Sequence, residues 1–298
     1  MSIEVMSEQS SITVLMLCWN HSQFLQKAIY SLTEQSDKNF DVVFLDNASS
    51  DGSEELAKTL FSACGLDAKV LTNDSPCGIS FNLNRLLSQT KSDIVCVISS
   101  DDWYDREYVA EVRKASENYP CSSLFYPKAY HYDDERNLVS NRPEGEFLSG
   151  NLWDYTRNLN WKFGIVGLAY RRLHLLKVGA WDEQMIAEDN DLLFRLSKGN
   201  VFIHIPKRLF YYRVSSSSIS SNYVFVMKSW YQFFDKHRHY FPNKDRLLFS
   251  YGKSHIIFAL KKRKLSQAGA LVPALLMSFF RTMIQYIKIR ATRVANEE

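Results

Sequence analysis

Several features that would assign this protein to a familiar class are missing from its sequence. The five cysteines show no Cys-x-x-Cys spacing, which argues against a thiolate metal cage, and their odd number argues against a disulfide framework. They are typical of the buried thiols of a cytosolic protein. No Gly-x-Gly-x-x-Gly follows the first predicted strand, and Gly-x-x-x-x-Gly-Lys-Ser/Thr is absent throughout. Nucleotide-binding loops of these two kinds are therefore excluded.

Long hydrophobic runs are also scarce. Glu4 and Glu8 precede a short apolar run at residues 12–19, a pattern unlike that of a signal peptide. The longest uncharged stretch is the 16 residues 265–280, which include Pro273, whereas a membrane-spanning helix needs about 20 apolar residues. The sequence therefore predicts neither a leader nor a spanning helix, and it favours a cytoplasmic location.

The composition is that of a folded protein with an uneven distribution of charge. The 298 residues are 46% hydrophobic and 23% charged, and the net charge is +3. Ten of the 36 Lys and Arg residues lie between Arg246 and Asn296, a region without Asp or Glu, which leaves 26 basic against 33 acidic residues elsewhere. The acidic body disfavours nucleic-acid binding, and the basic C-terminal region is a candidate for contact with an anionic surface.

The first 126 residues alternate between strand-like and helix-like patterns. Short apolar runs predict buried strands at 12–18, 40–45, 68–71 and 94–98. Apolar residues at helical spacing predict helices near 24–32, 56–61 and 80–89, and Ser53 is in a position to cap the second. Strands that alternate with helices favour an α/β fold in which a mostly parallel sheet is covered on both faces.

Polar clusters follow three of these strands, at residues 19–21, 46–47 and 101–102. Ligands of open α/β sheets bind beyond the carboxyl ends of the strands, where these clusters are expected to meet. Acidic strand ends without a phosphate-binding loop need a bridging cation to hold phosphates. Mg²⁺ or Mn²⁺ suits such a site, since both accept one or two protein carboxylates together with substrate phosphates.

Two acidic segments have both a functional and a structural explanation. Asp101 and Asp102 follow a buried strand directly, so they either hold a cation or cap a helix predicted from residue 104. Asp189, with Glu188 and Asp191, opens a helical pattern. These acids either complement the helix dipole or provide a general base, for which an Asp with an ordinary pKa near 3.9 is already ionised at neutral pH.

Over about residues 12–220 the sequence resembles the family 2 glycosyltransferases, which are inverting enzymes with a GT-A fold. The similar blocks occur in the family's order: the strand Val14–Cys18 with Asn20 and the stretch Ser31–Gln35, the block Leu45–Ser53, the stretch Ser75–Ile79 with Asn84, the metal-binding element at Ile98–Asp102, the blocks Gly179–Glu183 and Glu188–Arg195, and the closing stretch Tyr211–Val214 with Ser218.

This resemblance implies a role for each acid. Asp46 would bind the nucleotide base, Asp101 and Asp102 would bind the ribose and the metal-bound diphosphate, and Asp189 would deprotonate the acceptor hydroxyl. Further substrate-binding residues implied in the same way are Asn20, Asn47, Gly78, Asn84, Trp181 and Glu188. Two departures from the family pattern are Ser99, in place of the first Asp of the metal element, and Ser215, in place of a frequent His.

The implied activity is metal-assisted transfer of a sugar, with inversion, from a nucleotide-diphosphate donor to a hydroxyl of a glycan or lipid-linked acceptor. UDP is the expected nucleotide and surface polysaccharide synthesis the expected setting. Two alternatives stay open: a sugar nucleotidyltransferase, which would want a basic Gly-rich loop after the first strand, and an inactive nucleotide-sugar-binding protein at a membrane surface.

The expected organisation is a catalytic domain at 1–221 and a helical C-terminal region at 222–298. The catalytic domain divides into a nucleotide-sugar half at about 10–126 and an acceptor half at about 127–221. In the C-terminal region apolar residues recur at helical spacing from Leu271 to Ile287, interspersed with Arg281, Lys288, Arg290 and Arg293. Such a helix suits peripheral attachment to the inner face of the cytoplasmic membrane. Packing on the catalytic domain, or pairing with another copy of the chain, are the alternatives.

Overall fold

The computed structural model describes residues 9–140, 146–214 and 222–295, with side chains up to residue 284. Its chain forms two compact units. The first contains residues up to Gln184 together with Glu188–Val214, and the second contains Met185–Ala187 and the residues from Ser215 onward.

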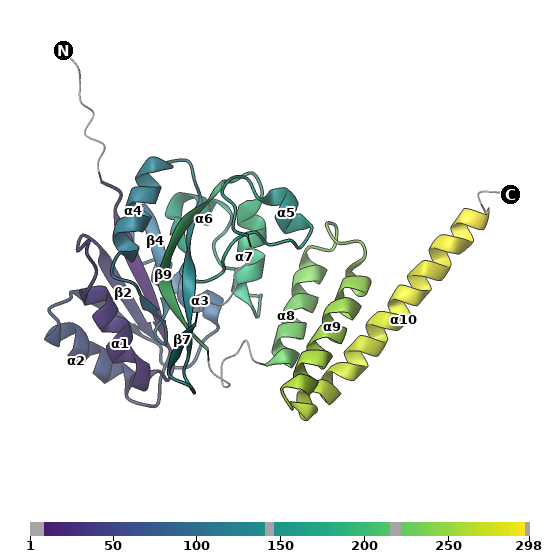
Figure 1. Ribbon diagram of the computed structural model, residues 1–298, viewed down its shortest axis with the longest axis horizontal. Helices are drawn as coiled ribbons and strands as arrows, with labels where there is room; N and C mark the ends of the chain where they lie inside the picture. The colour runs from purple at the N-terminus through teal and green to yellow at the C-terminus, as the bar shows by residue number, and fades with distance from the viewer. Residues whose placement is uncertain (1–8, 141–145, 215–221, 296–298) are drawn as a thin grey trace, which may run out of the picture. The chain divides into compact units, whose positions relative to one another are not determined.

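The first unit is built on one mixed sheet (Figure 1). Four parallel strands form one half in the order β3 (Ala68–Thr72), β2 (Asp41–Asp46), β1 (Ile12–Cys18) and β4 (Ile94–Ser99). The other half continues with β8 (Ala169–Arg171), β6 (Leu124–Asp133), β9 (Phe202–Val214) and β5 (Trp103–Tyr104), while β7 (Leu138–Ser140) pairs with β6. The predicted α/β fold is confirmed.

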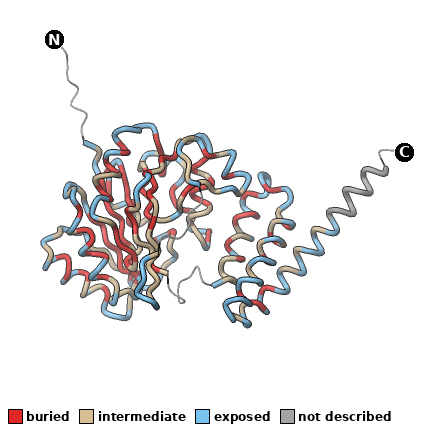
Figure 2. Tube along the Cα trace, in the orientation of Figure 1, coloured by how far each residue is buried: buried red, intermediate tan, exposed pale blue. Residues whose placement is uncertain are grey.

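Helices cover both faces of this sheet, because alternate strand residues point to opposite sides. Val14 and Met16 of β1 belong to one apolar core, with α1 (Ser22–Thr33), α2 (Ser53–Ala63) and α4 (Tyr108–Asn118). Leu15 belongs to a second core, with α3 (Ile79–Leu87), α6 (Arg172–Lys177) and α7 (Glu188–Ser197). Figure 2 shows the buried strands between these layers. The short helix α5 covers Trp153–Arg157.

Three local expectations are wrong. Residues 103 and 104 form β5, because they pair with Tyr211 and Phe210 of β9. The helix α4 therefore starts only at Tyr108, with Glu107 as its N-cap, so Asp101 and Asp102 are not helix caps. The N-cap of α2 is Gly52 in a left-handed conformation, not Ser53. Of the five free cysteines only Cys18 and Cys96 are buried.

The described part of the second unit contains the helices α8 (Tyr223–Lys236), α9 (Lys244–Lys261) and α10 (Leu265–Ala295). Close packing of α9 on α10 depends on Gly252, where an added Cβ would lie 3.1 Å from a methyl group of Leu275.

Residues Leu265–Ile284 of α10 are long and apolar enough to cross a membrane, by length and composition alone. No spanning helix was expected, because the uncharged stretch ends before Arg281, but the apolar character continues beyond it. A mostly buried core helix of a soluble protein can have the same length and composition, but only 11% of this segment is buried. The side chains of Ile287, Lys288, Arg290 and Arg293 lie outside the described part.

Candidate active site

The polar clusters predicted at the strand ends meet at one edge of the sheet. Cys18 at the end of β1 lies opposite Asp46 at the end of β2, and Leu17 lies opposite Ser99 of β4. Beyond the strands, the amide of Asn47 donates to the carbonyl of Cys18 and the amide of Ser100 donates to that of Leu17, both at 2.9 Å. The three loops therefore leave the sheet side by side.

Asp46 has one carboxylate oxygen in use and one without a partner. Its Oδ2 accepts a hydrogen bond of 2.8 Å from the amide of Ser49. Its Oδ1 is buried and has no hydrogen-bond partner among the described residues. A buried acceptor without a partner is costly, so this oxygen is suited to accept from an N–H group of a ligand.

Asn20 joins the loop after β1 to the loop after β2. Its backbone is left-handed, with φ of 54°, a conformation that Asn tolerates better than most residues. Its amide donates to Oγ of Ser49 at 2.8 Å, and its Oδ1 accepts from the amide of Ser50 at 2.9 Å. The side chain thus holds the loop that follows Asp46.

Asn47 holds the segment that leads into α3. Its Oδ1 accepts from Nδ2 of Asn73 at 2.7 Å and from the amide of Cys77 at 2.8 Å, while its Nδ2 donates to the carbonyl of Cys77 at 3.0 Å. Gly78, the next residue, is the N-cap of α3. The contacts of Asn47 therefore set the position of the Gly78 backbone at the sheet edge.

Asp101 and Asp102 differ in environment. Asp102 is buried, and its Oδ1 accepts a hydrogen bond of 2.7 Å from the amide of Arg213. Burial, and then the charge of Asp101, raise the pKa of Asp102 well above its ordinary value. The Asp101 side chain is about one quarter exposed, with its Oδ1 3.9 Å from Nδ1 of His21.

This pair fits a cation that completes its coordination with substrate. Within the described residues no group of three or more His, Cys, Asp or Glu side chains could hold a metal ion. Mg²⁺ is usually held by one or two carboxylates together with phosphates and water, and a cation would offset the unfavourable proximity of the two carboxylates. Asp101 and Asp102 are the residues that would hold it.

Arg213 supports this loop and was not predicted to take part. Besides the backbone bond to Asp102, its Nε donates to the carbonyl of Asp101 at 2.8 Å, and its guanidinium is ion-paired with Asp134. The same group lies 4.2 Å from the ring centre of Phe24. The only feature of the sequence that pointed to Arg213 was its place in the Tyr211–Val214 block. Ser215, which stands in place of a frequent His of the family, lies outside the described residues.

A cavity of about 140 Å³ brings the loop of Asp101 and Asp102 together with the start of α7. Asp102, Trp181 and Glu188 all line it. Asn84 fixes the Trp181 backbone: its Nδ2 donates to the carbonyl of Trp181 at 2.8 Å, and its Oδ1 accepts from the amide of Trp181 at 3.2 Å. Asn84 therefore acts on this cavity through Trp181.

The acids at the start of α7 have separate environments. Asp191 is buried and ion-paired with Arg195 at 2.8 Å, which indicates a structural role. Burial, and then the charge of Asp189, raise the pKa of Glu188 to about 7. Burial also raises the pKa of Asp189. The expectation that Asp189 has an ordinary pKa is therefore wrong, because sequence does not report how deeply the helix start is buried.

We expect the raised pKa of Glu188 to make stability depend on pH. Folded and unfolded chains both hold the proton below about pH 4.5, but between that value and about pH 7 only the folded chain does. Stability should therefore fall over this interval as the pH rises, by about 1–3 kcal/mol.

Glu188→Gln should remove most of this loss, so that the variant is more stable than the parent at pH 8 and equal to it near pH 4. Urea unfolding at both pH values measures this, with the exposed Glu55→Gln as control; equal stability of variant and parent at pH 8 would contradict it.

Comparisons with known proteins bear on the family and the fold of this chain. Residues 13–180 match the model of Glycosyl transferase family 2. The chain is 24% identical to the glycosyltransferase GlyA of Streptococcus pneumoniae serotype 4, in an alignment that covers 70% of this chain. It is 22% identical to the uncharacterized glycosyltransferase YfnE of Bacillus subtilis, in an alignment that covers 65% of this chain. It spans 31% and 62% of these two proteins.

Similar folds occur among solved structures. TarS residues 1–349 of S. aureus, solved with UDP-GlcNAc, has a TM-score of 0.62 at 16% identity, covering 90% of this chain and 81% of that one. The mannosyltransferase PcManGT of Pyrobaculum calidifontis, solved with GDP-Man and Mn²⁺, has a TM-score of 0.61 at 16% identity, covering 96% and 87%. More than half of the chain matches the family model, and the chain therefore belongs to glycosyltransferase family 2.

Proposed function

We propose that this glycosyltransferase transfers a sugar, with inversion and with the help of a divalent cation, from a UDP-sugar to a hydroxyl group of a glycan or lipid-linked acceptor in surface polysaccharide synthesis. The observation that carries the proposal is the cavity that both Asp102, from the strand-end loop, and Glu188, from the start of α7, line. Asp102 would bind the donor, and Glu188 is next to Asp189, the proposed general base. Both therefore lie beside the cavity in which the reaction would take place.

The chain's own residues supply binding and proton transfer. Asp46, Asp101 and Asp102 hold the donor at the sheet edge, and Asp189 accepts the proton of the acceptor hydroxyl as that oxygen attacks the anomeric carbon. The bond to the leaving diphosphate breaks on the opposite side. Single displacement of this kind needs no covalent nucleophile and inverts the anomeric configuration. A cation bound between Asp101, Asp102 and the phosphates would stabilise the negative charge of the leaving group.

The choice of UDP rests on Asp46. Ser49 already donates to its Oδ2, and Oδ1 is the oxygen without a partner among the described residues, so Oδ1 is the first acceptor for the base. One carboxylate oxygen matches the single ring N–H of uracil, whereas guanine presents a ring N–H and an amino group side by side and would be matched by both oxygens. TarS has been solved with UDP and with UDP-GlcNAc, whereas PcManGT has been solved with GDP-Man.

The stereochemical outcome tests the proposed reaction without knowledge of the acceptor. With UDP-GlcNAc and Mn²⁺ and no acceptor, slow transfer to water should release the sugar first as its β-anomer. Proton NMR during the first minutes, before the free sugar equilibrates, measures the ratio of anomers. Release of the α-anomer first would contradict inversion, and release that persists equally in Asp189→Asn would assign it to a contaminating hydrolase.

We further propose that α10 attaches the protein to the anionic inner face of the cytoplasmic membrane. Large apolar side chains on this helix are exposed, among them Met277, Phe280 and Ile284, each more than half exposed. Basic residues are interspersed without an acid up to residue 296. An apolar helix face with neighbouring cations favours the interface of an anionic bilayer, where each cation contributes about 1 kcal/mol.

We expect the double variant Phe280→Glu, Ile284→Glu to lose binding to vesicles, because the new charges face the acyl chains. Flotation with phosphatidylcholine vesicles of rising phosphatidylglycerol content measures this. The matched control is Leu173→Glu, Leu176→Glu, which replaces two exposed leucines of α6. The parent and the control should float, and high salt should release them. If the parent does not float, or the α10 variant floats equally well, the attachment is refuted.

A further inference from the structure

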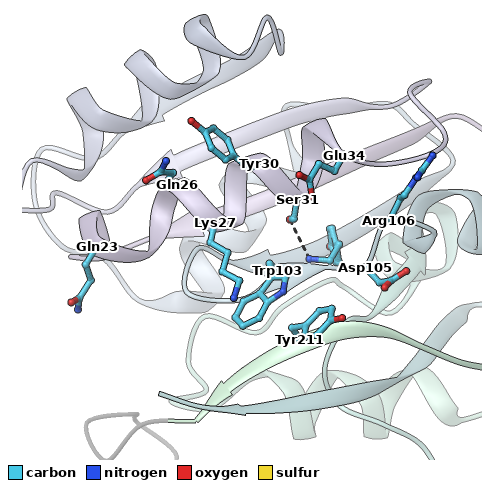
Figure 3. Close-up of a pocket in the computed structure, with 11 residues that line it drawn as sticks. Gln23, Gln26, Lys27, Tyr30, Ser31, Glu34, Trp103, Asp105, Arg106 and Tyr211 are labelled. Atoms are coloured by element: carbon cyan, nitrogen blue, oxygen red, sulfur yellow. Dashed lines mark hydrogen bonds between the residues drawn. The ribbon is translucent and has the colours of Figure 1, made fainter. Parts of the chain in front are cut away.

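A second polar and aromatic groove lies along α1, on the part of the sheet formed by β5 and β9. It has a volume of about 570 Å³, and neither Asp46 nor the acids of the active site line it. One wall is a face of α1 on which Gln23, Gln26 and Tyr30 recur at helical spacing, followed by Glu34, the C-cap of that helix. Figure 3 shows these side chains along the helix, with Trp103 and Tyr211 of the floor on the side that Lys27 reaches.

The floor is a rigid aromatic stack. The rings of Trp103 and Tyr211 are stacked with centres 4.9 Å apart, and Tyr130 stacks on Tyr211 at 4.6 Å. The Nζ of Lys27 lies 3.6 Å from the ring centre of Trp103. In Figure 3 it reaches that ring from the α1 side. Stacking favours defined orientations of aromatic rings, and Lys27 covers the Trp103 ring, which is buried.

The groove is lined by one exposed tyrosine ring and by equal numbers of positive and negative side chains. Tyr30 is 40% exposed on α1, so its ring is open to contact from solvent. Lys27 and Arg106 are the two cations that line the groove, and Glu34 and Asp105 are the two carboxylates. Equal numbers of opposite charges give no net attraction for a phosphate or a uronic acid. Amide, carboxylate and ammonium groups around aromatic rings provide many hydrogen-bond partners for an uncharged, polyhydroxylated ligand.

The groove is joined to the active site through the chain itself. Trp103 follows Asp102 directly. Its ring lies 5.3 Å from the guanidinium of Arg213, whose amide holds the Asp102 carboxylate. A ligand bound in the groove therefore lies beside the short β5 segment, which directly follows the loop of Asp101 and Asp102.

We propose that this groove is an acceptor subsite, which binds an uncharged sugar residue of the glycan at a distance from the hydroxyl group that is glycosylated. The inference rests on the proposed transferase function and adds the class of acceptor to it: a neutral oligosaccharide of several residues. Such a subsite contributes binding energy from a part of the substrate that does not react, which positions the part that does.

Binding of neutral glycans tests this directly. The full-length protein is applied to an array of neutral and uronic-acid-containing bacterial oligosaccharides, and the affinity for a retained neutral tetra- or hexasaccharide is then measured by calorimetry. Tyr30→Ala should weaken this binding about tenfold, the effect of losing about 1.4 kcal/mol, and Gln26→Ala should weaken it severalfold. The matched control is Tyr119→Ala, at an exposed tyrosine outside the groove, and it should bind as the parent does.

Binding of UDP with Mn²⁺ is measured on the same proteins and should be equal in all four. If the parent binds no UDP, the proposed function fails, whatever the glycan result. If UDP binding is intact but no neutral oligosaccharide is retained, or Tyr30→Ala binds it as tightly as the parent, the subsite is refuted. A preference for acidic over neutral glycans would equally refute it, because the balanced charges predict the opposite.

Discussion

In Asp102→Asn, metal-dependent binding of UDP should fall by at least about 100-fold. Removing a residue that only supports a metal ligand lowers metal affinity by up to about 100-fold. Asp102 is proposed as a ligand itself, so its loss should have at least this effect. The substitution removes the charge and keeps an oxygen that accepts from the amide of Arg213. Because the pKa of Asp102 is raised by burial and by Asp101, loss of this charge should leave stability unchanged or higher at pH 8.

Calorimetry with UDP in the presence of Mn²⁺ and then of EDTA measures the effect. The exposed Asp67→Asn, directly before β3, is the control and should bind as the parent does. Since the structure shows that Asp102 is not a helix cap, unchanged metal-dependent affinity in Asp102→Asn would leave Asp101 as the only carboxylate of this loop able to hold the cation. The two-carboxylate site would then be wrong.

In Asp189→Asn, turnover should fall by a factor of about 10²–10⁴, the usual contribution of a general base. The amide that replaces the carboxylate cannot accept a proton. Its Oδ1 can still accept from the amide of Asn190, as Asp189 does at 2.7 Å, so the start of α7 should keep its conformation. Release of UDP from a UDP-sugar, with and without acceptor, measures turnover, and calorimetry shows whether donor binding is retained.

The companion variant Glu188→Gln separates the two adjacent acids. It should lower turnover less than Asp189→Asn does, because Glu188 is assigned to the wall of the cavity and not to proton transfer. Near-normal turnover in Asp189→Asn would remove that residue from the mechanism. Glu188 would then be the candidate base, since Asp191 is engaged by Arg195.

The sheet and its helices followed from local patterns. The runs at 12–18 and 94–98 became β1 and β4 almost to the residue, because buried parallel strands are continuously apolar. The meeting of the strand-end clusters also followed, since parallel neighbours end at the same edge. Asp46, Asp101 and the loop containing Asn20 therefore lie where an argument from spacing alone puts them.

What sequence did not indicate depends on contacts between distant residues. The support that Arg213 gives to Asp102 joins residues 111 positions apart, and it exists because β5 pairs with β9 instead of starting a helix. The raised pKa values of Glu188 and Asp189 come from burial, which no local pattern reports. The groove beside α1 likewise needs both that helix and the β5–β9 pairing, so nothing in either segment alone indicated it.

Donor binding is tested most directly by a thermal-shift screen of the parent against nucleotide sugars and free nucleotides, each with Mn²⁺. A ligand at 100 times its dissociation constant adds about 2.7 kcal/mol to the stability of the folded state, which gives a clear rise in melting temperature. We expect UDP-sugars to raise the melting temperature, GDP-sugars to do so less, and Asp46→Asn to lose the response. A protein that no nucleotide sugar stabilises, or an Asp46→Asn variant that responds as the parent does, would contradict the account.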